Sequence, residues 1–266
     1  MASRRGNLQP AHKGYRYQDI WTAYVLVRAV VEGYDQVTVD RKQVADDRID
    51  DLEVISAGRR VRLQLKSSHN ADRQISERDF TAGDSSLRID RLVLTHVRAG
   101  AASAAEYRLC ATWQPPNSDD ALTPFLEAVE AEPTITGCSS RHFRVLGEHI
   151  WPQNSDPVWA PLKPYNTSGA EFDRADFITF CDRFLVELSL PLASTNLLVP
   201  GPLEQAVIQE LSDRIGIGRY PNHGRDPADV AALAVSLANL ARTQEATLSP
   251  KNIVRELAIR TDFGRV

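Results

Sequence analysis

Residues 49–68, IDDLEVISAGRRVRLQLKSS, predict two antiparallel strands joined by an Ala-Gly turn. Side chains alternate between the two faces of a strand. The apolar residues of the second strand therefore share one face, which we expect in a core, and Arg62, Gln64 and Lys66 share the other. Asp51 opens the first strand. We expect the polar face to be exposed, because an acid beside a Gln-x-Lys strand can hold a divalent cation and a phosphate together.

The segments around this hairpin predict an α/β protein with a mixed sheet and helices packed against it. Residues 14–33 carry a broad apolar face at helical spacing and end at a glycine, which predicts a buried helix. Alternating or continuously apolar patterns predict further strands at 36–40, 91–96 and 106–113. A short helix is expected at 122–131.

The last third of the sequence is typical of an all-helical subdomain. Helices are expected at 171–188, 202–215, 226–242 and 249–260. The last two begin with a capping residue followed by proline, a combination that favours a helix start. The expected domains are a core at 1–132, an irregular connection at 133–170 and a helical subdomain at 171–266.

Charge is distributed unevenly along a chain that is acidic overall. The net charge of the 266 residues is −4, so no global basic signature for nucleic acid is present. Two segments, 1–16 and 59–66, carry several basic residues and no acidic one. Such a local positive field can bind phosphate. The residues that we expect to contact a nucleic-acid backbone are Lys13, Arg16, Arg59, Arg60 and Arg62. The alternative is a solvated loop and a solvated strand face.

The cysteines and the hydropathy pattern bear on where the protein works. Cys110, Cys138 and Cys181 have no metal-ligand spacing, and this odd number without a signal sequence indicates reduced thiols. No apolar run approaches the roughly 18 residues that a membrane span needs. We therefore expect a soluble cytoplasmic protein that does not bind a membrane.

The hairpin carries the groups that phosphodiester hydrolysis requires. A bound Mg²⁺ can activate water, stabilise the charged phosphorus and assist the leaving oxygen. Asp51 can supply a carboxylate, Gln64 an amide oxygen and Leu65 a backbone carbonyl to such an ion. Lys66, on the face of Gln64, can orient water or neutralise developing charge. Glu53 shares the face of Asp51 and offers a second carboxylate.

These residues resemble the PD-(D/E)xK nuclease superfamily in its Q-x-K variant, which Mrr-type restriction nucleases share. The matching positions are Asp51 for the metal-binding acid, Gln64 for the second acidic position and Lys66 for the catalytic lysine. The resemblance implies a restriction-endonuclease-like fold and Mg²⁺, with Mn²⁺ as a substitute. Gln64 stands where Glu is commoner, so the metal should bind less tightly than in the Glu form.

A second motif, KGYRYQD at 13–19, resembles the G-x-x-Y-Q opening of a bacterial antiphage nuclease domain. That domain occurs at the N-terminus of CD-NTase-associated effectors and of STAND-type NTPase defence proteins. The resemblance implies that Gln18 approaches the catalytic site and that the substrate is double-stranded DNA. No helix-turn-helix or zinc-finger pattern occurs in the sequence, so we expect contacts mainly with the DNA backbone and weak sequence preference. The resemblance also implies a regulatory or sensor domain or chain as a partner. We expect a homo-oligomer, because two copies suit a double-strand break.

Several alternatives stay open at this point. The protein could be a catalytically inactive nucleic-acid-binding or assembly module of a defence complex, or a nuclease specific for RNA. Asp51 could be a solvated acid beside a turn, and Gln64 with Lys66 an ordinary strand face. Gln18 could serve only to satisfy a backbone group on an otherwise apolar helix.

Overall fold

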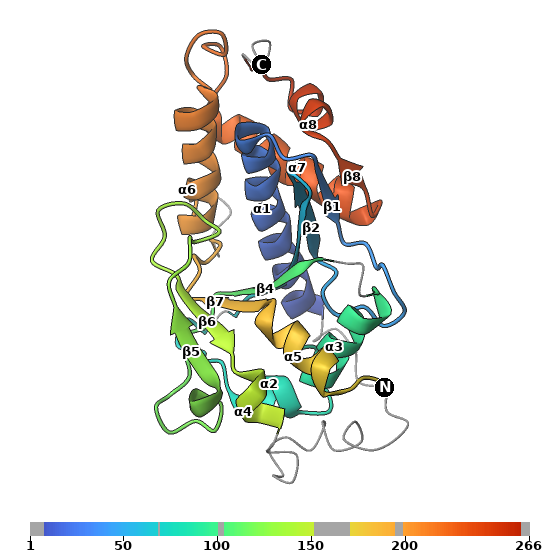
Figure 1. Ribbon diagram of the computed structural model, residues 1–266. Helices are drawn as coiled ribbons and strands as arrows, with labels where there is room; N and C mark the ends of the chain where they lie inside the picture. The colour runs from blue at the N-terminus through green and yellow to red at the C-terminus, as the bar shows by residue number, and fades with distance from the viewer. Residues whose placement is uncertain (1–7, 69, 101–103, 152–170, 195–198, 262–266) are drawn as a thin grey trace, which may run out of the picture. The chain divides into compact units, whose positions relative to one another are not determined.

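The computed structural model describes residues 8–68, 70–100, 104–151, 171–194 and 199–261, and for residues 8–13 it describes the backbone alone. In these residues eight strands form one mixed sheet in the order β5-β6-β7-β4-β3-β2-β1-β8. Helices flank the sheet (Figure 1). The expected class, an α/β mixed sheet with helices against it, is confirmed.

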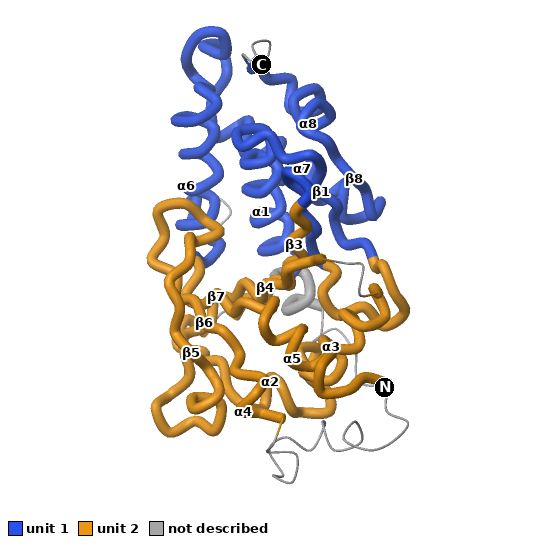
Figure 2. The backbone as a smooth tube through the Cα atoms, viewed as in Figure 1, with its two compact units in different colours: residues 1–41, 51–58, 191–266 blue, residues 42–50, 59–190 orange. Residues whose placement is uncertain are grey.

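The chain divides into two compact units that are discontinuous in sequence (Figure 2). Unit 1 comprises residues 1–41, 51–58 and 191–266, and unit 2 comprises residues 42–50 and 59–190. The sequence instead predicted domains that follow one another along the chain. Each unit therefore takes part of the hairpin segment, with its first strand in unit 1 and its second in unit 2.

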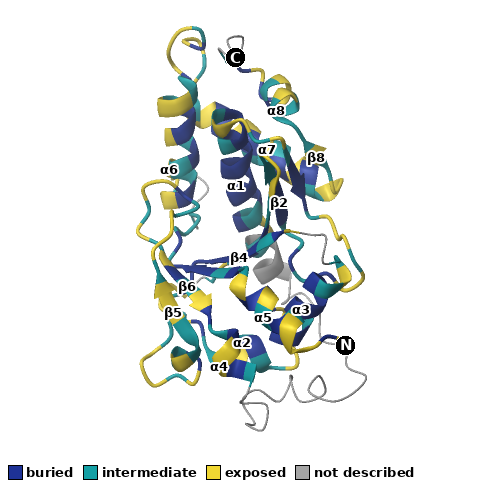
Figure 3. Ribbon diagram, in the orientation of Figure 1, coloured by how far each residue is buried: buried dark blue, intermediate teal, exposed yellow. Residues whose placement is uncertain are grey.

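Unit 1 is built around one long helix, α1 (Leu8–Glu32). It packs against α6 (Pro202–Gln209), α7 (Pro227–Thr243) and α8 (Pro250–Glu256), so the two ends of the sequence share one core. The helix is buried along most of its described length (Figure 3), because it carries apolar residues on several of its sides and these pack into the core. Unit 1 also holds three antiparallel strands: β1 (Gln36–Val39), β2 (Leu52–Ser56) and β8 (Thr247–Leu248).

Unit 2 holds the remaining strands and an aromatic core. Two parallel pairings join β3 (Arg59–Lys66), β4 (Glu106–Ala111) and β7 (Phe184–Leu188), and β6 (Arg141–Val145) and β5 (Leu126–Val129) follow antiparallel. Its helices are α2 (Glu77–Thr81), α3 (Ile89–Arg98), α4 (Gly147–Ile150) and α5 (Arg174–Asp182), with a 3-10 turn, η1, at Thr123–Phe125. Phe180 stacks on Phe184 with ring centroids 5.0 Å apart.

The hairpin turn is confirmed in its position and its chemistry. Strand β2 ends at Ser56 and β3 begins at Arg59, which leaves Ala57 and Gly58 as the loop. Both have positive φ, 47° and 78°. A two-residue loop with positive φ at both positions matches the right-handed twist of the flanking strands. Gly58 adopts this conformation without strain, since it has no Cβ.

The expected strand at 91–96 is wrong, because this segment belongs to α3. A short apolar run can be a buried strand or a buried helix, and its periodicity alone does not distinguish them. In the structure Ile89, Leu92, Val93 and His96 are buried at the i, i+3, i+4 and i+7 spacing of one helical face. The helix ends just before Gly100, whose φ is 85°.

The helix expected at 122–131 is also wrong, and the one expected at 171–188 is correct only up to Asp182. The first segment contains η1 and β5. In the second, helix α5 stops at Asp182 and the chain continues as β7. The Phe spacing suits a helix up to Phe180, but Phe184, Val186 and Leu188 alternate as in a strand, and all three are buried.

The helix starts near the C-terminus are confirmed by their caps. Asp226 accepts a hydrogen bond from the amide of Ala228 at 2.7 Å, and Ser249 accepts one from that of Asn252 at 3.3 Å. The expected helix at 202–215 is α6 followed by a π-helical segment, η4 (Glu210–Ile215). Its end at Gly216, with φ of 78°, follows the usual preference for glycine after a helix.

Candidate active site

The two sequence motifs meet within unit 1. Gln18 on α1 donates a hydrogen bond from Nε2 to Oδ1 of Asp51 at 2.8 Å, across 33 positions of sequence. The backbone of Asp51 is held as well, because its carbonyl accepts from the amide of Asp40 at 2.9 Å. Asp51 is thus held through its carboxylate by α1 and through its backbone by the residue that follows β1.

Glu53, the possible second carboxylate, lies on β2 opposite Thr38 of β1. Its side chain is mostly covered, with 8 % of the residue exposed. Thr38 also faces Thr247 of β8, and their hydroxyl oxygens are 3.0 Å apart. Glu53 therefore lies on a sheet face of unit 1 that also carries the polar residues Thr38 and Thr247, and it stays a candidate ligand.

In unit 2, β3 is covered more completely than its sequence predicted. The expected exposure of the polar face is wrong for Arg62 and Gln64, which are 1 % and 5 % exposed, and only Lys66 at the strand end is half-buried. Leu65, the residue proposed to offer a carbonyl, pairs with Cys110 in the β3–β4 ladder. The physical reason is that β3 is an inner strand running parallel to β4, and parallel strands are usually covered on both faces.

Arg62 makes a buried ion pair in place of the expected DNA contact. Its Nη2 lies 2.6 Å from Oδ2 of Asp47. Asp47 also accepts hydrogen bonds from the amides of Gln43 and Ile49, at 2.9 and 3.1 Å. Sequence reasoning missed this pair, because Arg62 shares its strand face with Gln64 and Lys66, and such a polar face does not signal burial. We interpret Arg62 as a structural residue, whose ion pair with Asp47 connects β3 to the 42–50 segment.

Lys66 lies in the electrostatic field of the acids that precede β2. Burial raises the pKa of Asp50 above its ordinary value, and the charge of Asp47 raises it further, whereas Lys42 and Lys66 act in the opposite direction. The backbone around Lys66 is fixed, because its carbonyl accepts from the amide of Thr112 at 3.1 Å. The positive charge of Lys66 therefore acts on the carboxylate of Asp50 within unit 2.

The other expected DNA contacts differ in their surroundings. The side chain of Arg59 is 72 % exposed and pairs with the half-exposed Glu106 at 2.7 Å. Arg60 is half-buried on the same strand. Arg16 pairs with Glu204 at 3.2 Å within unit 1. The side chain of Lys13 lies outside the described residues.

A second polar cluster, in unit 2, was not foreseen from the sequence. Glu187 on β7 is completely buried and accepts hydrogen bonds from the hydroxyl of Ser140 and the amide of Thr134, both at 2.8 Å. Arg108 and His142 lie within 3.4 Å of the same carboxylate. These donors compensate the buried charge, so the cluster is a closed internal network.

The polar residues of α1 also find partners that the sequence did not reveal. Asp19, next to Gln18, accepts from Nε of Arg242 at 2.7 Å and from Nδ2 of Asn239 at 2.9 Å. These contacts connect α1 to α7 within unit 1. A buried acid in an apolar helix signals that a donor must exist, but its identity depends on residues more than 200 positions away.

No model of a protein family matches the chain, and no curated protein matches it either.

Proposed function

We propose that the protein is a metal-dependent DNA endonuclease, acting as the effector domain of a bacterial antiphage defence system. The observation that carries the proposal is the hydrogen bond between Gln18 and Asp51. These residues come from two motifs that were recognised separately, and their contact within unit 1 is expected if both serve one catalytic site. The mixed sheet supports the same fold class.

The proposed metal ligands are the carboxylate of Asp51, the amide oxygen of Gln64 and the carbonyl of Leu65. The donor set fits Mg²⁺ or Mn²⁺, because all of these ligands are hard oxygen atoms. Among the described residues no three His, Cys, Asp or Glu side chains form a metal-binding group, so water and substrate phosphate would complete the coordination. When bound, the ion would lower the pKa of a water molecule and stabilise charge on the phosphate.

The protein residues have distinct tasks in this proposal. Gln18 orients Asp51, and it does so without adding charge. Lys66 donates hydrogen bonds to the phosphate or orients the attacking water, and its positive charge compensates the charge that develops on the phosphate. Arg59 contacts the DNA backbone, since its guanidinium is exposed and its ion pair with Glu106 is solvated. Arg62 has no part in the interface, because it is buried.

An inactive nucleic-acid-binding module is the second candidate. One observation favours it: Gln64 stands where Glu is commoner and so removes one negative charge from the proposed metal site. The two candidates differ in one measurable property, since both bind DNA but only the nuclease converts it to product.

The test is a plasmid cleavage assay with purified protein, Mg²⁺ or Mn²⁺, and an EDTA control. A parallel reaction with single-stranded RNA separates the two substrate classes. Gln18→Ala should reduce the cleavage rate by about tenfold or more, because misplaced ligands slow catalysis strongly. Glu32→Gln, at the other end of α1, is the matched control and should cut like the wild type. Metal-dependent cleavage that is equal in all three proteins would contradict the proposed role of Gln18.

We also propose that the nuclease is restrained when isolated and becomes active on clustering. A weakly specific nuclease would damage host DNA, and one catalytic centre cuts one strand at a time. Two copies related by symmetry suit a duplex. Cleavage rate measured against protein concentration, with light scattering in parallel, tests this. A rate that rises more steeply than linearly supports it, and efficient double-strand cleavage by a strict monomer contradicts it.

A further inference from the structure

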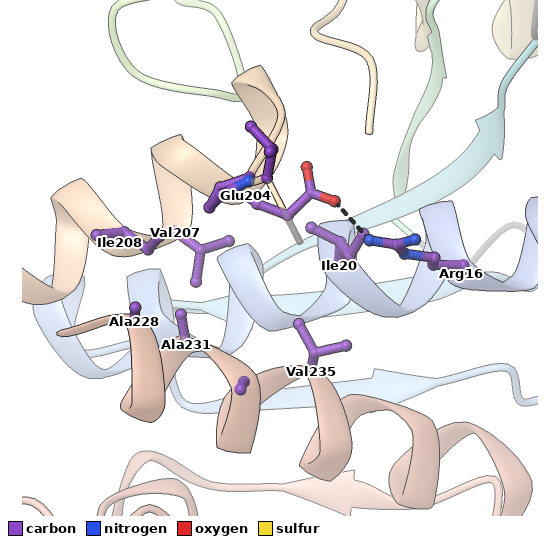
Figure 4. A pocket seen from close by; sticks show the side chains of 11 residues that line it. Arg16, Ile20, Glu204, Val207, Ile208, Ala228, Ala231 and Val235 are labelled. Atoms are coloured by element: carbon purple, nitrogen blue, oxygen red, sulfur yellow. Dashed lines mark hydrogen bonds and ion pairs between the residues drawn. The ribbon is translucent and has the colours of Figure 1, made fainter. Parts of the chain in front are cut away.

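Unit 1 contains a pocket between α1, α6 and α7 that no step of the proposed nuclease reaction uses (Figure 4). Its volume is about 370 Å³, which falls within the range of roughly 300–1,000 Å³ that is usual for small-molecule sites. The wall is mainly aliphatic: Ile20 comes from α1, Val207 from α6 and Val235 from α7. The pocket thus has the size and lining of a ligand site.

The pocket exists because α7 presents small side chains to it. Ala228, Ala231 and Ala232 line the cavity at the i, i+3 and i+4 positions of one helical face. Protein interiors are normally packed as densely as organic crystals, and larger residues at these positions would fill the space. Ile20 and Val207 are each 1 % exposed, so the inner wall is part of a firm core.

One ion pair forms the polar edge of this apolar pocket. Arg16 donates from Nη2 to Oε1 of Glu204 at 3.2 Å (Figure 4). Glu204 does not depend on this contact, because its carboxylate also accepts from the amides of Ser194 and Gly201, at 3.1 and 3.2 Å. The second of these is the helix-capping interaction at the start of α6. Glu204 would therefore remain satisfied if Arg16 turned to another anion.

Arg16 has the capacity to bind such an anion. A guanidinium carries five N–H donors in a planar fork that fits a carboxylate. Among the described residues, Glu204 is the hydrogen-bond partner of Arg16. Its side chain is 33 % exposed, which leaves it accessible at the pocket edge. The apolar wall favours a hydrocarbon chain, whereas a highly charged phosphate compound would lose hydration there without compensation.

We infer that this pocket binds a small aliphatic carboxylate, with its chain against the valine, isoleucine and alanine side chains and its carboxylate on Arg16. This function goes beyond the proposed nuclease activity and does not depend on it. The site lies on the same helix as Gln18, two positions away in sequence. A bound carboxylate would thus contact the helix that orients Asp51.

The experiment uses sodium octanoate as the probe and octanamide as its uncharged counterpart, with binding to the full chain measured by calorimetry. Arg16→Gln should weaken octanoate binding by about tenfold or more, because it removes a charged hydrogen bond, and should leave octanamide binding unchanged. The matched control is Arg214→Gln, which removes another Arg–Glu pair of unit 1, the one with Glu32. It should bind octanoate like the wild type.

A second pair of variants tests the location of the chain. Ala232→Leu fills the pocket from an exposed position of α7 and should abolish binding of both compounds. Ser236→Leu adds the same side chain one turn later, outside the lining, and should change neither. Circular dichroism of each unliganded variant confirms folding. The inference is overturned if octanoate fails to bind the wild type, binds no better than octanamide, or binds Arg16→Gln and Ala232→Leu as tightly as the wild type.

Discussion

Replacing Arg62 with alanine should reduce the stability of the protein strongly. The side chains of Arg62 and Asp47 are 2 % and 0 % exposed, and their charged atoms are 2.6 Å apart. Removal of Arg62 leaves the buried charge of Asp47 with two amide hydrogen bonds but no opposite charge, and breaking a buried ion pair in this way typically costs about 3–5 kcal/mol. With a urea m-value of roughly 3 kcal/mol/M for a chain of this size, the unfolding midpoint should fall by about 1–1.7 M.

The assay is urea unfolding followed by circular dichroism. Arg59→Ala is the matched control, because Arg59 lies on the same strand with its side chain 72 % exposed, and its loss should change stability by about 0.5 kcal/mol or less. The double variant Asp47→Ala/Arg62→Ala should lose less stability than the two single losses added together. Equal midpoints for Arg62→Ala and Arg59→Ala would refute the assignment of Arg62 to a buried structural pair.

Three further predictions follow from the site and the core. Gln64→Glu should retain cleavage or change the preferred metal, and should exceed Gln64→Ala at every Mg²⁺ concentration; the reverse order would place Gln64 away from the metal. Arg59→Ala should weaken DNA binding for all sequences and reduce its salt slope by about one counterion, and an unchanged slope would remove Arg59 from the interface. Burial raises the pKa of the Cys110 and Cys181 thiols, so a thiol reagent at neutral pH should modify the half-buried Cys138 first, and equal rates would contradict this.

The sequence was sufficient to predict the turns and helix starts that depend on one or two specific residues. The Ala-Gly turn between β2 and β3 and the Asp-Pro and Ser-Pro helix starts were predicted correctly, because each rests on the conformational preference of one or two residues. The segment 91–96 and the chain after Asp182 were predicted wrongly. There the apolar pattern suits a helix and a strand equally, and the packing of unit 2 decides between them.

The arrangement of the candidate site was also predictable in one part and not in another. The pairing of Gln18 with Asp51 could be anticipated from two motifs, and it occurs in unit 1. The burial of Arg62 and Gln64 could not, because alternation along a strand tells which residues share a face but not whether another segment covers that face. For Arg62 the covering acid is Asp47, from a segment without any periodic signal.

Among the described residues, no helix combines the length and the hydropathy that a bilayer span requires. Double-stranded DNA, a homo-oligomer and a regulatory partner are proposals that rest on the motifs and on the chemistry of the site.

The most direct test of the central claim is metal-dependent plasmid cleavage by the wild type, Asp51→Asn and Lys66→Ala, with a thermal melt of each protein. Loss of a charged catalytic group commonly lowers the rate by a factor of about 10² or more. The account predicts that the wild type cuts DNA with Mg²⁺ or Mn²⁺ but not with EDTA, and that both variants lose cleavage while staying folded. Cleavage by Lys66→Ala at the wild-type rate, or a wild type that binds DNA without ever cutting it, would contradict the account.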